Sequence, residues 1–261
     1  VPALSRFEEP LDLNLVFSGH GKHLDCPTLQ LANHHGLMIA GEAALSNWDA
    51  GMDMYIYGKL GNLIMTKEGI NVLMTNLTGK VPPILQRLDY IRFNGEAAGY
   101  LHDLTLTGLF HTGAGMVKTD VMMSIDEQSM SRTYSGSVAS ADLDLGKLLN
   151  QEKKFGKVDF NVELKGFNYK NRYPESYIKG IISSFEYSQY QYENIMLDGV
   201  YKDGGFNGRL SMDDANGSVQ IDGNFNVAKT IPDFNLKASV KNLRPHDLHL
   251  SDKYENASIS L

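Results

Sequence analysis

Eight histidines and one cysteine are the residues of this 261-residue chain best suited to bind a transition metal. His20, His23 and Cys26 follow one another at intervals of three, and His34 and His35 come one expected hairpin later. Nitrogen and sulfur ligands of this kind suit zinc. A second cysteine pair is missing, however, and Pro27 follows Cys26 directly. We therefore expect histidines on a surface hairpin and no metal site.

A second group of residues has the ligand chemistry of calcium. Asp213, Asp214, Asn216 and Gly217 stand close together, as oxygen ligands do in a calcium-binding loop. The glutamate that ends such a loop is missing, and a strand pattern follows at once. The same residue types tolerate the backbone angles of tight turns. We expect a hairpin turn here and no cofactor.

Signatures of common enzymes are absent from the sequence, which counts mildly against catalysis. One aromatic tract could serve as a platform for a sugar or a peptide, and an enzymatic or sugar-binding β-domain is therefore one hypothesis. Cross-strand pairing of aromatic residues in a sheet explains the tract more simply. We favour this explanation and expect no catalytic residues. The tract consists of Tyr177, Phe185, Tyr187, Tyr190 and Tyr192.

Composition excludes several classes of protein. The formal net charge is −7, and basic residues are not clustered, which argues against binding to nucleic acid. A single cysteine rules out an internal disulfide framework. No run of about 18 apolar residues is present, so no segment is expected to cross a membrane as a helix. The alternation at residues 258–261 suggests that the sequence is a fragment that stops within a strand.

Alternation of apolar and polar residues is the dominant pattern, and it is typical of strands that bury one face. Turn-forming residues separate these segments at Thr112–Gly115, Lys202–Gly205 and Asp213–Gly217. The regular spacing predicts an antiparallel meander of short hairpins. Representative apolar positions of one parity are Val158, Phe160, Val162 and Leu164, and then Ile195, Leu197 and Tyr201.

Helices are expected at only two places. Pro83 starts a possible turn or two through residue 88, and Asp142 or Asp144 could cap a helix within residues 143–150. Residues 61–75 fit either a helix or a strand. We interpret residues 1–261 as one continuous β-repeat region with a soft boundary near 142–150. This boundary would separate a first β section, 1–141, from a second, 151–261.

The apolar face of such strands must be buried in some way. The sheet could close on itself as a sandwich whose side chains interlock, with the two layers about 10 Å apart. It could instead curl into an open groove that receives acyl chains or an unfolded strand. Periodicity does not distinguish these structures, and the residues alone favour the sandwich.

Several segments combine a strand, a turn and a glycine in a recurring order. They are residues 85–95 continuing to 110–112, residues 144–149, and residues 192–202, 206–211 and 216–223. In their order and density these segments resemble the TamB branch of the AsmA-like envelope proteins, and in particular the version found in Bacteroidetes.

The resemblance implies an all-β fold with an elongated, curled antiparallel sheet, an apolar inner face and one or two short helices. It also implies a periplasmic segment of a Gram-negative protein that is anchored in the inner membrane outside this sequence. The implied function is non-catalytic conduction of phospholipid between the inner and outer membranes. An alternative is a scaffold or chaperone for outer-membrane protein insertion with a BamA-type barrel partner. Either way, the expected partners are acyl chains or client strands, and not nucleic acid.

Side chains of one parity are expected to line the apolar groove and contact acyl chains. This hypothesis requires neither a cofactor nor a dedicated site for the lipid headgroup. The predicted lining residues are Leu104, Leu106, Phe110, Val121, Met123, Ile125, Val158, Phe160, Val162, Leu197, Leu210, Val219, Ile221 and Leu236.

Overall fold

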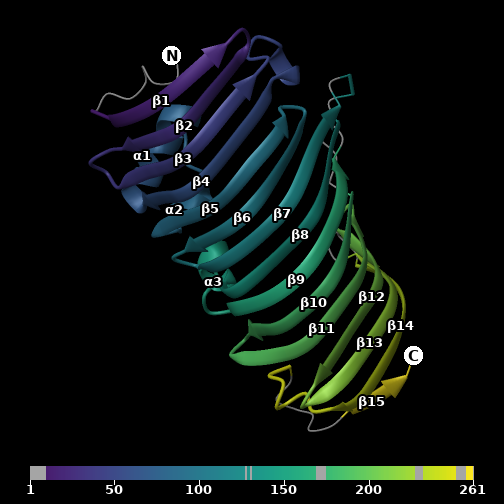
Figure 1. Ribbon diagram of the computed structural model, residues 1–261. Coiled ribbons are helices and arrows are strands. Elements are labelled where there is room, and N and C mark those ends of the chain that lie inside the picture. The colour runs from purple at the N-terminus through teal and green to yellow at the C-terminus, as the bar shows by residue number, and fades with distance from the viewer. Residues whose placement is uncertain are drawn as a thin grey trace. The chain divides into compact units, whose positions relative to one another are not determined.

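Antiparallel strands make up most of the computed structural model, in agreement with the predicted all-β class (Figure 1). The structure describes residues 10–126, 128–129, 131–168, 175–226, 232–250 and 257–260. The chain divides into two compact units, Val1–Met122 and Met123–Leu261. This division does not coincide with the soft boundary expected near 142–150, because those residues lie inside the second unit.

The first unit is a meander in which β1 to β6 pair antiparallel, each strand with the next. Strand β7 begins in this unit and ends in the second. The bounds are β1 Asp12–His20, β2 His23–Ala32, β3 Leu37–Ser46, β4 Tyr55–Thr66, β5 Tyr90–Tyr100, β6 Asp103–Thr112 and β7 Gly115–Asp126.

The second unit repeats this arrangement from β8 to β15, again with each strand antiparallel to its neighbours in sequence. The expected turns at 202–205 and 213–217 join β11 to β12 and β12 to β13. The bounds are β8 Ser131–Asp144, β9 Phe155–Asn168, β10 Glu175–Tyr187, β11 Tyr190–Lys202, β12 Gly205–Asp214, β13 Gly217–Asn226, β14 Asp233–Leu243 and β15 Ala257–Ser260.

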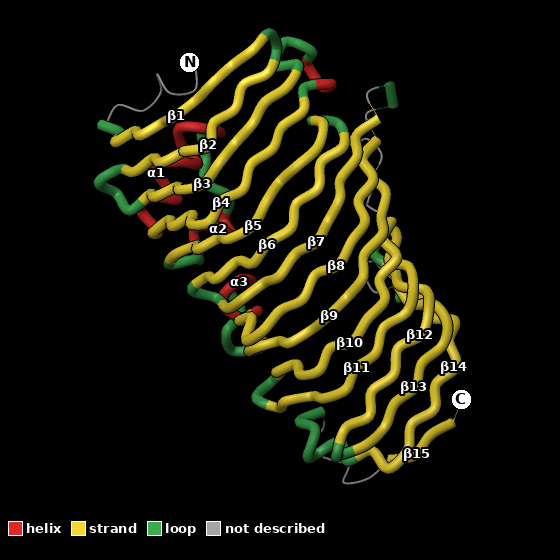
Figure 2. Tube along the Cα trace, in the orientation of Figure 1, coloured by secondary structure: helices red, strands yellow, loops and turns green. Residues whose placement is uncertain are grey.

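In the described part of the chain, three α-helices interrupt the strands, one more than expected (Figure 2). Helix α2, Pro83–Gln86, starts at the predicted proline, and α3, Leu145–Leu149, is capped by Asp144, which accepts a hydrogen bond from the Lys147 backbone. The ambiguous segment 61–75 contains the end of β4 and the start of α1, Lys67–Thr78. A short 3₁₀ turn covers Gly51–Asp53.

The register places the apolar residues of successive strands on one face of each unit, which we call the apolar face. In the first unit, β3 to β6 align Leu45 with Ile56, Ile56 with Gly99 and Gly99 with Leu104. In the second unit, β10 to β13 align Gly180 with Leu197, Leu197 with Leu210 and Leu210 with Ile221. The residues between these positions point to the opposite face, which carries most of the charged side chains.

The best-buried apolar residues lie near one end of the strands in each unit. In the first unit they include residues next to or within α1 and α2, and in the second they lie near α3 and the turn at residues 244–250. Packing of these short covering segments therefore closes one end of each apolar face. The buried residues are Leu37, Ile70, Leu88, Ile91, Phe93 and Ala114 in the first unit, and Leu143, Val158, Tyr192, Met212 and Leu248 in the second.

Candidate functional site

The middle of the apolar face in the second unit is a continuous surface of aliphatic side chains and glycine. One row runs across the strands through residues that pair directly in the register. No charged or hydroxyl side chain interrupts it. The row consists of Val138, Val162, Gly180, Leu197, Leu210, Ile221 and Ala238.

Side chains of this row are half-buried, although the buried apolar residues are confined to one end of the strands. Along β9, Val162 and Leu164 are half-buried, whereas Asn161, Glu163 and Lys165 on the opposite face are exposed. The strands of the second unit bend along their length (Figure 1). From the lower exposure of the apolar face we infer that it lies on the inside of this bend, where side chains converge and shield one another. The surface is thus sheltered from water and accessible at the same time.

The predicted lining residues are distributed over both units. The register aligns Leu104, Leu106 and Phe110 with Gly99, Ala97 and Phe93 on the apolar face of the first unit. Val121, Met123 and Ile125 share one parity of β7, and the Thr107 hydroxyl donates to Asp120 on the other parity at 3.1 Å. On the apolar face of the second unit lie Val158, Phe160, Val162, Leu197, Leu210, Val219, Ile221 and Leu236.

Two of these residues do not have the intermediate exposure expected of a groove lining: one is buried and the other is exposed. Val158 has a relative exposure of only 3% and lies at the end of β9 that contacts α3, so it belongs to the packed core. Met123 is 42% exposed and has little shelter. The accessible part of the face lies between the covered end and the opposite end of the strands.

A tyrosine lies flat across the apolar face at the end away from α3. The ring of Tyr134, on β8, occupies the space that a β-carbon on Gly166 of β9 would need. Its hydroxyl reaches over β9 to form a short hydrogen bond with the Ser176 hydroxyl of β10. Only glycine at position 166 leaves room for this crossing. Sequence alternation could not reveal it, because it joins three strands through side-chain contacts.

The aromatic tract does not form one platform, because Tyr177 points to the face opposite the other four residues. The Tyr177 hydroxyl donates to Asp198 at 2.8 Å on that opposite face. Phe185 pairs with Tyr192, and Tyr187 pairs with Tyr190, in the register of β10 and β11. These contacts agree with the cross-strand interpretation.

Residues 244–250 cover the aromatic end of the apolar face. Leu248 is fully buried against Tyr192 and Met212, and its carbonyl accepts a hydrogen bond of 2.8 Å from the Tyr192 hydroxyl. The Tyr190 hydroxyl donates to Asp214. Burial, and to a smaller extent this hydrogen bond, raises the pKa of Tyr190 to about 12. Asp214 also accepts from the Asn216 backbone, so the calcium-like residues form a hairpin turn, as expected.

Histidines of the suspected zinc cluster make other contacts. His23 is bonded to Ser46 at 2.7 Å and to Asp25 at 2.9 Å, and the Cys26 thiol donates to the Thr28 carbonyl. His35 contacts Glu68 at 2.7 Å. Within the described ranges, no three His, Cys, Asp or Glu side chains are grouped so that they could hold a metal ion.

The chain was compared with protein-family models, with curated proteins and with solved structures. None of them matches. Helices in the described part of the chain are too short or too polar to cross a membrane. The chemistry of the apolar face is therefore the basis for assigning a function.

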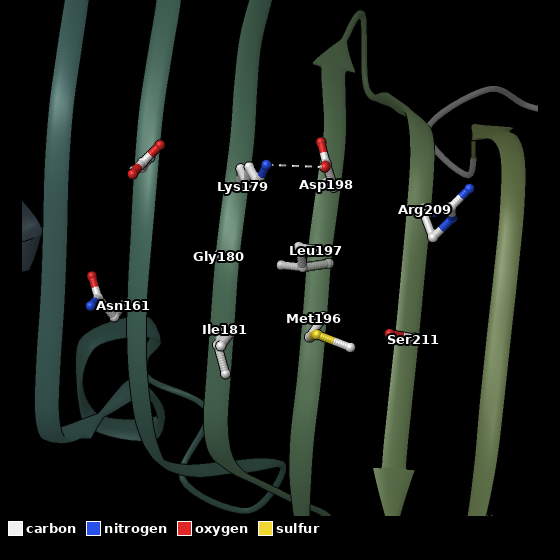
Figure 3. Close-up of a pocket in the computed structure, with 10 residues that line it drawn as sticks. Asn161, Lys179, Gly180, Ile181, Met196, Leu197, Asp198, Arg209 and Ser211 are labelled. Carbon is white, nitrogen blue, oxygen red and sulfur yellow. Dashed lines mark ion pairs between the residues drawn. The ribbon is translucent and has the colours of Figure 1, made fainter.

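The face opposite the apolar face carries a shallow recess of about 510 Å³ over β9 to β12 (Figure 3). Ile181 and Met196 are half exposed in it, beside an ion pair of 3.7 Å between Lys179 and Asp198. Charges alternate in sign along the register row that contains this pair. The row consists of Glu163, Lys179, Asp198, Arg209, Asp222 and Lys237. Such alternation stabilises the register of neighbouring strands.

Proposed function

We propose that the chain binds phospholipid acyl chains on its apolar face and conducts them, without catalysis, between the two membranes of a Gram-negative envelope. The observation that carries the proposal is the uninterrupted aliphatic row from Val138 to Ala238, whose residues are half-buried and therefore still accessible. Its place in the periplasm, and in a longer protein anchored in the inner membrane, rests on the resemblance to the TamB branch of AsmA-like proteins.

Acyl chains match this surface in both polarity and energy. Burial of a methylene group contributes about 0.8 kcal/mol, so a half-covered chain of about a dozen carbons gains roughly 5 kcal/mol. This is enough to hold the chain and still allow it to move. Because the aliphatic row crosses successive strands without a polar barrier, a lipid can pass from one strand to the next at similar free energy.

Site-specific photocrosslinking tests the proposal. A photoreactive amino acid at Val162 should crosslink phospholipid from vesicles, whereas the same group at Glu163 should not. The two positions are neighbours on β9 and differ in the face to which they point. Equal labelling at both positions, or no labelling at Val162, would refute binding of lipid to the apolar face.

Conduction needs a second measurement. In a transfer assay between donor and acceptor vesicles, the chain should accelerate exchange of a fluorescent phospholipid, and Val162→Asp should abolish the acceleration. Glu163→Asp is the matched control, because it leaves the apolar face unchanged. Crosslinking without transfer would restrict the function to lipid binding, and crosslinking to unfolded outer-membrane protein in place of lipid would favour the scaffold alternative.

A further inference from the structure

The apolar face of the second unit differs in chemistry between its two ends. On β8 and β9 the covered end contains Leu143 and Val158, which are 8% and 3% exposed. The opposite end carries the hydrogen-bonded hydroxyls of Tyr134 and Ser176. An exposed arginine, Arg132, follows there on the apolar face. The gradient along these strands therefore runs from buried and aliphatic to polar and cationic.

Register fixes the position of the arginine. Tyr134 pairs with Gly166 and Arg132 with Asn168, so Arg132 lies one step beyond the tyrosine on the same face. Among the described residues of β9 and β10, the acidic residue nearest to Arg132 in the register is Glu175, which points to the opposite face and is paired with Lys202 at 2.7 Å. A guanidinium group on this face suits phosphate, because its planar N–H donors match the phosphate oxygens.

The length of the aliphatic part agrees with that of a lipid tail. A strand rises about 3.3 Å per residue, so Phe160 and Gly166 are about 20 Å apart along β9. The hydrocarbon core of a bilayer is about 30 Å thick, so the chains of one leaflet extend about 15 Å. Acyl chains lying along the strands therefore fit between the covered end and the hydroxyl pair.

We propose that this face binds a phospholipid in one orientation, with the chain ends toward Leu143 and Val158 and the phosphate at Arg132 and the Tyr134–Ser176 hydroxyl pair. This inference rests on the proposed function and adds to it a headgroup site, which the sequence did not lead us to expect. The Tyr134 ring forms the border between the two parts of the site, because it presents an apolar ring to the chains and a hydroxyl to the headgroup.

Two short-chain probes test the headgroup site with the full 261-residue chain. Dioctanoyl phosphatidylglycerol carries the phosphate, and dioctanoylglycerol lacks it. Arg132→Gln should weaken binding of the first probe roughly tenfold, the size expected for loss of a charge-assisted hydrogen bond, and leave the second unchanged. Lys165→Gln is the matched control: it removes an equal charge one residue from Gly166, but on the opposite face. It should change neither affinity.

The outcomes separate this inference from the proposed function. If the unaltered protein binds neither probe, both are refuted. If it binds both and Arg132→Gln weakens them equally or not at all, or Lys165→Gln has the same effect as Arg132→Gln, the headgroup site is refuted and the acyl-binding face stands.

Orientation has its own test with phospholipids that carry a diazirine either at the chain end or in the headgroup. The chain-end probe should label positions near Leu143 and Phe160, and the headgroup probe should label Tyr134 or Ser176. A reversed or identical distribution of labels would overturn the single orientation.

Discussion

Introducing the same charge at two positions of β9 should separate the packed end of the apolar face from its accessible middle. Val158 is 3% exposed, whereas Val162, two alternations further along the same face, is half-buried. An aspartate buried at position 158 must protonate or remain an unpaired charge. With an ordinary pKa of about 3.9, protonation at pH 7 costs about 4 kcal/mol, because each pKa unit is worth about 1.36 kcal/mol.

Val158→Asp should therefore reduce the free energy of unfolding by about 4 kcal/mol, in addition to the packing that is lost. Val162→Asp should reduce it by only about 1 kcal/mol, because the carboxylate remains in contact with water in the lipid-free protein. An acyl chain that covers this carboxylate removes it from water, so lipid binding then bears the same free-energy cost of protonating the aspartate. Lipid affinity of Val162→Asp should thus fall by up to roughly 10³-fold, which corresponds to about 4 kcal/mol.

Urea denaturation followed by circular dichroism measures the first effect, and binding of a fluorescent phospholipid measures the second. Val162→Asn is the control, because asparagine has nearly the same size as aspartate but no charge. This variant should lose much less lipid affinity than Val162→Asp. If both aspartate variants were destabilised equally, the middle of the face would be a closed core, as in a sandwich. If Val162→Asp bound lipid normally, the acyl chains would not cover this position.

Three further perturbations address other parts of the second unit. Arg209→Asp places three carboxylates in a row with Asp198 and Asp222, so unfolding free energy should fall by about 1 kcal/mol and recover in high salt; a loss that ignores salt would contradict the charge argument. Leu248→Ala should cost about 2–5 kcal/mol in the same measurement, since Leu248 is fully buried, and a loss below about 1 kcal/mol would show that the covering turn contributes little. Because its raised pKa favours the neutral phenol, Tyr190 contributes stability that is complete below pH 10 and is lost as the pH rises toward about 12; Tyr190→Phe should flatten this loss, and an unchanged pH profile would refute it.

Alternation in the sequence predicted the strands well, because burial of one face imposes a period of two. The turns at residues 202–205 and 213–217 were predictable for a similar reason, since glycine and aspartate tolerate their backbone angles. Odd or even position in the sequence is a less reliable guide to the face on which a side chain lies where the strand register shifts. The register shifts between Ser140 and Leu143, so both lie on the apolar face although their numbers differ in parity.

Sequence reasoning could not locate the ends of the apolar face, because these depend on contacts between distant segments. Leu248 covers Tyr192 across 56 residues of sequence, and nothing in the local pattern around it differs from an ordinary turn. The secondary structure of residues 61–75 was ambiguous in the sequence because β4 ends at Thr66 and α1 begins at the next residue. Thr66 caps the helix by accepting a hydrogen bond of 3.2 Å from the Gly69 backbone. The proposed headgroup site at Arg132 was not predictable from the sequence, because a single charged residue produces no periodic pattern.

Pairing of each strand in β8 to β14 only with its neighbours in sequence also affects how the second unit folds. In a meander the two strands of each hairpin follow each other in sequence, so each hairpin can form soon after its residues become available, without waiting for a distant partner. Stability then resembles a sum of hairpin and nearest-neighbour terms, as in repeat proteins. Opening of one hairpin can remain local, and a chain that emerges progressively can fold in the order of its sequence.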